Sequence, residues 1–269
     1  MALNAPTAED LRPREGEELV FDTNPVLNER VTHYCPGCHH GIAHRLVSEV
    51  LNELGVAPRT ILVAAVGCAT FTYDYFNVDS VEAPHGRACA VATGVRRARP
   101  EAVVFTYQGD GDMAAIGTGE SIHAANRGER ITAVFVNNTV YGMTGGQMAP
   151  TTLLGQKTTT TVQGRNMGNE GGPIRFCELL AQLDGVAYAA RCALDTVKHV
   201  REAKRALRKA FEVQIDGLGF GFVEFLSGCP TNWHMDPIAA NKRIAEVMIP
   251  AFPLGVFKDR SKGGEAKDA

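Results

Sequence analysis

Several features are scarce or missing in this chain of 269 residues. It has no excess of basic residues, since 27 Lys and Arg stand against 30 Asp and Glu, which disfavours a general nucleic-acid binder. No apolar run approaches the roughly 20 residues needed to cross a bilayer. The acidic start, with Glu15, Glu17 and Glu18, does not resemble a secretory signal. We therefore expect a cytoplasmic protein that neither binds nucleic acid nor inserts into a membrane.

Seven cysteines in a chain without an export signal indicate a reducing compartment, where thiols bind metals or pack in the core. Three of them lie in helical or strand-end positions and are predicted to be structural: Cys89, Cys177 and Cys192. Cys35 and Cys38 have the Cys-x-x-Cys spacing. That spacing binds zinc, carries a redox disulfide or holds an iron–sulfur cluster, and the pair alone leaves all three open.

The middle of the chain alternates predicted strands and helices. The predicted strands are 61–66, 102–107, 131–136, 186–190 and 220–226, and the predicted helices are 42–54, 88–97, 113–126, 174–183 and 196–211. This alternation predicts an α/β fold with a doubly wound, mostly parallel sheet over residues 31–257. Residues 1–30 are expected to form an N-terminal arm that lies on a partner or frays, and residues 258–269 a disordered C-terminal tail.

Polar residues follow four of the predicted strands. Cys68 comes just after the first strand and Asp110 just after the second. Asn138 follows the third, and Cys229 follows the last. Because ligands of such sheets bind beyond the carboxyl ends of the strands, we expect these four residues to gather at one edge.

Gly109-Asp110-Gly111 and the later Asn137-Asn138 suggest a magnesium site. Mg²⁺ prefers oxygen ligands and often shares a site with phosphate groups. Asp110 offers a carboxylate, Asn138 an amide oxygen, and the chain near Val140 a backbone carbonyl. The glycines are expected to let the backbone turn and approach a phosphate, and the helix predicted from residue 113 to aim its first amides there. Gly-Asp-Gly alone fits an ordinary turn, but the paired asparagines and the later Thr-Gly-Gly-Gln favour a cofactor site.

These motifs together resemble the thiamine diphosphate motif. The run from Asn137 to Gln147 is similar to the catalytic β subunit of the 2-oxoacid:ferredoxin oxidoreductases, as are residues 34–38 (Tyr-Cys-Pro-Gly-Cys) and 85–88 (His-Gly-Arg-Ala). The likeness covers roughly residues 31–237. Within the family it is greatest to the branched-chain (2-oxoisovalerate) type and its aryl-oxoacid relatives, such as phenylglyoxylate dehydrogenase. Many relatives have Gly after the second cysteine, where this chain has His39.

The resemblance implies a set of site residues. A [4Fe-4S] cluster would be ligated by Cys35, Cys38, Cys68 and Cys229. Mg²⁺ would be held by Asp110, Asn138 and Val140. Thiamine diphosphate would lie against Gly109, Asp110, Gly111, Asp112, Asn138, Val140, Tyr141, Gly142, Thr144, Gly145, Gln147 and Cys68. The candidate catalytic residues are His85, Arg87 and Met143, although His85 and Arg87 fit equally well as braces of their own loop.

The activity implied is oxidative decarboxylation of a branched-chain or aryl 2-oxoacid to its acyl-CoA and CO₂, with coenzyme A as co-substrate. Electrons would pass from the thiamine diphosphate enamine to the cluster and on to ferredoxin or a ferredoxin-like γ/δ subunit. The glutamate that activates the cofactor is expected on a partner α subunit. Apolar Phe71 and Met143, where some relatives have basic or polar residues, favour an apolar substrate side chain.

Other interpretations stay open from the sequence. One is a non-oxidative thiamine diphosphate decarboxylase or ligase subunit with a zinc site, and another is a non-catalytic electron-transfer subunit. His39 and His40 either adjust a cluster by hydrogen bonding or are tolerated local changes. The basic residues of the helix at 196–211 either dock an acidic electron carrier or form a solvated face.

Overall fold

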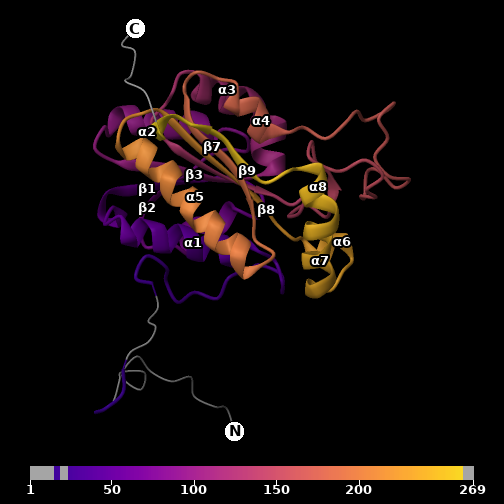
Figure 1. Ribbon diagram of the computed structural model, residues 1–269, viewed down its shortest axis with the longest axis horizontal. Helices are drawn as coiled ribbons and strands as arrows, with labels where there is room; N and C mark the ends of the chain where they lie inside the picture. The colour runs from indigo at the N-terminus through magenta and orange to yellow at the C-terminus, as the bar shows by residue number, and fades with distance from the viewer. Residues whose placement is uncertain (1–14, 19–23, 263–269) are drawn as a thin grey trace.

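A computed structural model describes residues 15–18 and 24–262 of the chain. Its main feature is a seven-stranded sheet in the order β2-β1-β3-β4-β8-β7-β9 (Figure 1). The strands are β1 (Thr60–Ala64), β2 (Asp79–Glu82), β3 (Val103–Gly109), β4 (Thr132–Asn137), β7 (Val186–Ala193), β8 (Phe220–Leu226) and β9 (Gly255–Asp259). All neighbours pair in parallel except β9, which is antiparallel to β7. A small hairpin of β5 (Val140–Tyr141) and β6 (Gln147–Met148) stands apart from the sheet.

Helices cover both faces of the sheet. One face carries α1 (His40–Glu53) and α5 (Val197–Ile215), and α5 crosses the front of the sheet in Figure 1. The connections between β1, β3, β4 and β7 run over the other face through α2 (Ala88–Ala98), α3 (Thr118–Asn126) and α4 (Phe176–Ala181). Beyond β8 lie the short helices α6 (Pro230–Trp233), α7 (Pro237–Arg243) and α8 (Ile249–Ala251). Among the helices of the described residues, none has the length and apolar character that a bilayer span requires.

Burial on both faces explains the sequence of the central strands. Every residue of β4 and β8 is buried, so both strands are almost continuously apolar instead of alternating. Helix α5 is amphipathic and begins at Thr196, whose hydroxyl oxygen accepts a hydrogen bond from the backbone N–H of His199. The predicted doubly wound, mostly parallel α/β fold is confirmed.

Two predicted boundaries were wrong. The helix predicted over 113–126 is split into a π-helical turn at Asp112–Ile116 and α3, and only glycine fits between them at position 117, where a Cβ would lie 2.4 Å from the Asp112 carbonyl oxygen and 2.7 Å from that of Gly86. The turn therefore does not offer a regular helix amino terminus to an anion.

The predicted C-terminal tail also begins too early, since Lys258 and Asp259 belong to β9 and residues 260–262 form a 3₁₀ turn. Residues 263–269 lie outside the described part.

The predicted N-terminal arm is only partly described, because residues 1–14 and 19–23 lie outside the described part. Its last residues do not form a separate arm. Val26 is buried in the core, and Leu27 forms an antiparallel bridge with Phe76. Asn77 donates its backbone N–H to the carbonyl of Val26. Residues 24–28 therefore belong to the body of the domain.

A buried ion pair joins β7 to β8. Nε of Arg191 donates to the Glu224 carboxylate at 2.8 Å, and both residues are about 1% exposed. The same guanidinium also binds Glu178 of α4. The second carboxylate oxygen of Glu224 accepts a hydrogen bond from Asn137 at the end of β4 at 2.7 Å. The network thereby holds the end of β4, where the paired asparagines begin, against β8.

Replacing Arg191 with Met should leave Glu224 buried with Asn137 as its remaining donor. Breaking one side of a buried pair typically costs about 3–5 kcal/mol of unfolding free energy, and we expect a loss of that size at about pH 8. Burial raises the pKa of Glu224. The unpartnered carboxyl should therefore take up a proton as the pH falls, and the loss should shrink toward about pH 5.5.

Urea unfolding at the two pH values measures this difference. Lys242→Met is the control, because Lys242 pairs with Glu246 on the surface and should cost less than about 0.5 kcal/mol. A loss for Arg191→Met as small as that of the control, or one that grows as the pH falls, would contradict the interpretation.

Candidate active site

A cavity of about 270 Å³ opens at the carboxyl edge of the sheet, where β1, β3 and β4 end. Its lining includes twelve of the predicted site residues: Cys68, His85, Gly109, Asp110, Gly111, Asp112, Asn138, Val140, Tyr141, Gly142, Met143 and Thr144. Five further lining residues were not predicted as site residues: His40, Val66, Gly67, Ala69 and Thr70. The expectation that residues after different strands gather at one edge is thus met for Cys68, Asp110 and Asn138.

Asp110 is a carboxylate held in a buried position at the end of β3. It is 3% exposed, and this burial raises its pKa to about 7, although hydrogen bonds from Thr151 and the Gly111 backbone favour the charged form. The Thr151 hydroxyl donates to one carboxylate oxygen and the Gly111 N–H to the other, both at 2.8 Å. A buried carboxylate of this kind is stabilised by a bound cation, which fits the predicted magnesium ligand.

Asn138 lies beside Asp110 in a tight turn after β4. Its side-chain oxygen accepts the N–H of Val140 at 3.2 Å, and its backbone carbonyl accepts the indole N–H of Trp233 at 3.1 Å. Thr139 between them has a φ of 63°, which is uncommon for a residue other than glycine. The turn brings an amide group and the backbone of Val140 to the cavity, and such oxygen donors match the preferences of Mg²⁺.

Both glycines flanking Asp110 were predicted to let the backbone turn and approach a phosphate, and their surroundings differ. Neither has a positive φ, so neither is required for a left-handed turn. A Cβ at Gly111 would lie 2.1 Å from the ring of Tyr141, so glycine is required there by close packing. A Cβ at Gly109 would meet no atom within 4 Å, and Gly109 lines the cavity. Gly109 therefore leaves open space in which a bound group can approach the backbone.

Asp112 orients His85 at the cavity wall. One oxygen of its carboxylate lies 2.6 Å from Nδ1 of His85 and accepts the N–H of Gly86, and the other accepts the amide of Gln108 at 2.7 Å. Both oxygens of the Asp112 carboxylate thus have protein partners, and Asp112 acts by orienting His85.

Arg87, in contrast, is not part of the lining and pairs with Glu120 at 2.6 Å. Its position favours the interpretation of Arg87 as a brace of the loop.

Three other residues singled out from the sequence lie outside the lining. Gly145 and Gln147 belong to the turn and second strand of the β5–β6 hairpin, where the Gln147 amide donates to the Thr144 carbonyl at 2.9 Å. Phe71 lies in a 3₁₀ turn with its ring edge against His33, 5.1 Å between centroids. Of the two apolar residues proposed to favour an apolar substrate, Met143 therefore lines the cavity and Phe71 does not.

The four cysteines predicted as cluster ligands are neighbours in space. Burial and the nearby Cys38, Cys229 and Cys35 raise the pKa of Cys68 to about 12, and burial followed by Cys229 and Cys35 raises that of Cys38 to about 11. A Cβ added at Gly142 would lie 3.1 Å from the sulfur of Cys68 and 3.7 Å from that of Cys229. Within residues 15–18 and 24–262, no three His, Cys, Asp or Glu side chains gather closely enough to hold a single metal ion.

Burial and the neighbouring thiols disfavour a thiolate at any one of these positions. A cationic group bound by all four sulfurs would offset that cost, so the set suits such a group. Iron–sulfur clusters are held by such sets of thiolates. The other three cysteines fit the predicted structural role. Cys89, Cys177 and Cys192 are buried, and burial raises the pKa of each.

His39 links two of the cysteine-bearing loops. Its Nδ1 accepts the N–H of Gly228, next to Cys229, at 3.2 Å, and its Nε2 lies 2.7 Å from the side-chain oxygen of Asn241 in α7. The same segment reaches Gly37, where an added Cβ would overlap Pro237. Because both ring nitrogens of His39 have protein partners, it is placed as a structural tie and not as a donor to a cluster.

His40 is a buried imidazole in the cavity wall. Its Nδ1 lies 2.7 Å from the hydroxyl of Tyr107, and its ring stacks on that of Tyr34 with centroids 4.6 Å apart. Burial lowers the pKa of His40 to about 3, so the ring is neutral. No sequence pattern indicates this position of His40 in the cavity wall, apart from its place after the second cysteine, and none indicates the contact of Thr151 with Asp110.

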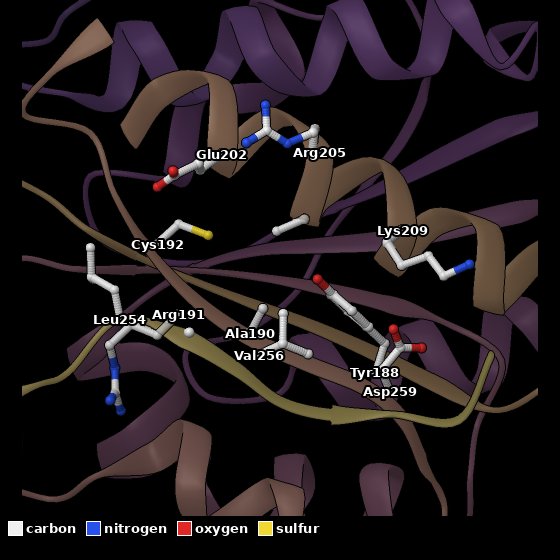
Figure 2. Close-up of a pocket in the computed structure, with 12 residues that line it drawn as sticks. Tyr188, Ala190, Arg191, Cys192, Glu202, Arg205, Lys209, Leu254, Val256 and Asp259 are labelled. Carbon is white, nitrogen blue, oxygen red and sulfur yellow. The ribbon is translucent and has the colours of Figure 1, made fainter. Parts of the chain in front are cut away.

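A larger cavity of about 470 Å³ lies between α5, β7 and β9 (Figure 2). It contains none of the predicted cofactor residues. Arg205 and Lys209 are balanced by Glu202 and Asp259, and the Cys192 thiol has its pKa raised to about 12 by burial. The buried carboxylate of Asp110, the neutral imidazole of His40 and the thiol of Cys68 all line the smaller cavity, which is therefore the candidate active site.

The basic residues of α5 are partly engaged in ion pairs with α1. Lys204 contacts Glu49 at 2.7 Å and Glu53 at 2.6 Å, and Arg208 contacts Glu53 at 3.4 Å. These pairs favour the ordinary interpretation of this helix as a packed and solvated surface element.

Comparison with known proteins is consistent with this site. The family model "Thiamine pyrophosphate enzyme, C-terminal TPP binding domain" matches residues 65–225, more than half of the chain. Ketoisovalerate oxidoreductase subunit VorA of Methanothermobacter thermautotrophicus is 48% identical over 255 residues, covering 95% of this chain and 54% of the relative. The 2-oxoglutarate synthase subunit KorB of Methanocaldococcus jannaschii is 37% identical over 208 residues, covering 77% of this chain and 73% of the relative.

A solved structure is also similar. It is a 2-oxoglutarate:ferredoxin oxidoreductase from Magnetococcus marinus with 2-oxoglutarate, coenzyme A and succinyl-CoA bound. The TM-score is 0.71 at 25% sequence identity, and the match covers 88% of this chain and 84% of that one. This chain spans about half the length of the VorA relatives that it matches.

A pair of alanine substitutions tests the two glycine roles. Gly111→Ala should force the Tyr141 ring to move and destabilise the ligand-free protein by about 1–3 kcal/mol, as overpacking does. Gly109→Ala should leave the ligand-free protein within about 0.5 kcal/mol of the original and weaken thiamine diphosphate binding, because its methyl group enters the cavity. Urea unfolding and calorimetric titration measure the two effects. Equal destabilisation by both substitutions would contradict the assignment.

Proposed function

The chain belongs to the 2-oxoacid:ferredoxin oxidoreductases, a family of thiamine pyrophosphate enzymes, and from this premise we propose that it is their catalytic, cofactor-binding subunit. The proposed reaction is oxidative decarboxylation of a branched-chain or aryl 2-oxoacid to its acyl-CoA and CO₂. The observation that carries the proposal is the buried carboxylate of Asp110, which shares one cavity with Asn138 and Cys68.

We assign the magnesium–diphosphate end of the cofactor to the ends of β3 and β4. Asp110 and Asn138 offer oxygen ligands there, together with the backbone of Val140. When bound, thiamine diphosphate supplies a nucleophilic carbon that attacks the 2-oxo group and allows CO₂ to leave. The chain's own part is to orient the diphosphate, to leave space for it beside Gly109 and to present a neutral His40 and an Asp112-oriented His85 to the bound molecules.

We assign a [4Fe-4S] cluster to Cys35, Cys38, Cys68 and Cys229. Cys68 lines the cavity, so a cluster at this position would begin beside the bound cofactor. Such a cluster accepts electrons one at a time, and its potential depends on charge, hydrogen bonds and exposure. Asn232 donates to the Cys229 sulfur at 3.2 Å and is one source of such a hydrogen bond.

The substrate proposal rests on Met143. It lines the cavity, it is 45% exposed, and no Lys or Arg that could pair with a second carboxylate is among the described lining residues. An apolar wall of this kind suits a branched-chain or aryl side chain better than a dicarboxylic acid. The 48% identity to a ketoisovalerate oxidoreductase subunit points in the same direction.

We further propose that the chain works in a hetero-oligomer. No glutamate is among the described residues that line the cavity, and Glu120 and Glu129 have other partners, Glu120 with Arg87 and Glu129 with Arg97 and Arg127. A partner α subunit is therefore the proposed source of the glutamate that activates the cofactor. A ferredoxin-like subunit or ferredoxin is the proposed electron acceptor.

Asp110→Ala should abolish turnover of the reconstituted complex, because the cofactor loses its charged magnesium ligand. Asp79→Ala, on the exposed edge strand β2, is the matched control and should keep full activity. An anaerobic visible spectrum of the same preparations should show broad iron–sulfur absorption that dithionite bleaches. Retained turnover in Asp110→Ala would favour a non-catalytic electron-transfer subunit, and a colourless active protein containing zinc would favour a non-oxidative decarboxylase or ligase.

Substrate preference is measured by reduction of an artificial acceptor with 2-oxoisovalerate, phenylglyoxylate, indolepyruvate, pyruvate and 2-oxoglutarate. We expect one of the branched-chain or aryl substrates to have the highest kcat/KM. Met143→Lys should shift the ratio of kcat/KM toward 2-oxoglutarate by at least about tenfold, since a cation can pair with the second carboxylate. Met167→Lys, an exposed change elsewhere on the surface, should not shift it. Preference of the original protein for 2-oxoglutarate would refute the substrate proposal.

A further inference from the structure

The segment that follows β6 is connected directly to the proposed magnesium site. Thr151 and Thr152 are fully buried, and their hydroxyls donate to groups at the ends of two different strands. Thr151 binds the Asp110 carboxylate at the end of β3 at 2.8 Å. Thr152 binds the carbonyl of Thr139, in the turn after β4, at 2.5 Å. These two adjacent threonines thus touch both halves of the proposed metal site.

Gln156 adds a second contact with the turn after β4. Its amide donates to the hydroxyl of Thr139 at 3.0 Å and, less closely, to the carbonyl at 3.3 Å. Thr139 has the positive φ that this turn requires. Contacts that fix Thr139 therefore also fix the relative positions of Asn138 and Val140 on either side of it.

Arg165 holds the threonine pair in place from behind. Its guanidinium donates to the carbonyls of Pro150 and Thr152, on both sides of Thr151, at 2.8 and 2.6 Å. It also donates to Gly171 and Gly172 at 2.8 and 2.7 Å, with two longer contacts to neighbouring carbonyls. Arg165 is 6% exposed, so a buried cation is satisfied here by backbone carbonyls.

This use of arginine is specific. Five N–H groups in a rigid plane can reach carbonyls on two separate stretches of chain, which the three donors of a lysine ammonium cannot reproduce. The stretch between β6 and α4 extends away from the sheet on the right of Figure 1. The guanidinium joins the two ends of that stretch, at 149–152 and 170–172.

We propose that Thr151 and Arg165 are positioning residues for the magnesium–diphosphate site, an inference that rests on the proposed function. Thr151 fixes the direction of the Asp110 carboxylate toward the cation. Arg165 acts through Thr151 by fixing the backbone on both sides of it. Neither residue touches the cofactor or the reacting atoms in this scheme.

The test uses the complete complex, stripped of cofactor with a chelator and then titrated calorimetrically with thiamine diphosphate at fixed Mg²⁺. Thr151→Val should weaken cofactor binding by about tenfold or more, the usual effect of losing a hydrogen bond to a charged group. Thr151→Ser, which keeps the hydroxyl, should restore it. Thr159→Val is the matched control, because Thr159 is exposed on the same segment and should bind as the original does.

Two further measurements separate positioning from general stability. Thr151→Val should lower the unfolding midpoint of the stripped complex slightly, because the buried Asp110 carboxylate loses a donor, but its lost affinity should return when Mg²⁺ is raised, which simple destabilisation would not allow. Arg165→Met should weaken binding to a similar extent, and adding Thr151→Val to it should cause little further loss, because both act on the same carboxylate. If Arg165→Met does not fold, the comparison of Thr151→Val with Thr151→Ser still decides the question.

Three results would overturn the inference: original affinity in Thr151→Val, equal weakening by Val and Ser, or a lower unfolding midpoint with no rescue by Mg²⁺. A different result concerns the proposed function itself. If the original complex takes up no thiamine diphosphate at any Mg²⁺ concentration, the proposed function fails, and the inference with it.

Discussion

The buried carboxylate of Asp110 is the constraint on which the rest of the site depends. A charge at 3% exposure is costly, and the chain offsets that cost with the Gly111 N–H, the Thr151 hydroxyl and an open side toward the cavity. These contacts fix where the ends of β3 and of the segment after β6 must meet. The form of the surrounding loops follows from that requirement, including the close packing of Tyr141 on Gly111.

The paired asparagines after β4 show how core and site are joined. Consecutive residues leaving a strand point in opposite directions. Asn137 turns inward and donates to Glu224, which is itself held by Arg191, while Asn138 faces the cavity. One dipeptide therefore connects a buried ion pair to the proposed magnesium ligand. The stability of the sheet and the geometry of the site share the same few residues here.

Much of this arrangement could be predicted from local patterns. Continuous apolar runs predicted the central strands, and the rule for parallel sheets placed Cys68, Asp110 and Asn138 together. What could not be predicted depends on long-range packing. The π-helical turn ends at Gly117, which lies against Gly86, and strand β9 is short, partly exposed and antiparallel. Likewise, no local signal distinguishes the buried Thr151 from the exposed Thr159 and Thr160 of the same segment.

The tie formed by His39 has a consequence for the order of events during synthesis. It joins a residue next to Cys38 to one next to Cys229, 189 positions further along the chain, so Cys229 must be synthesised and folded back before its thiol can approach the other three. Metal delivered to the nascent chain would meet an incomplete set of sulfur donors. Insertion of the proposed cluster would therefore be a late step, and it would depend on the folding of α7 against the segment that holds Cys35 and Cys38.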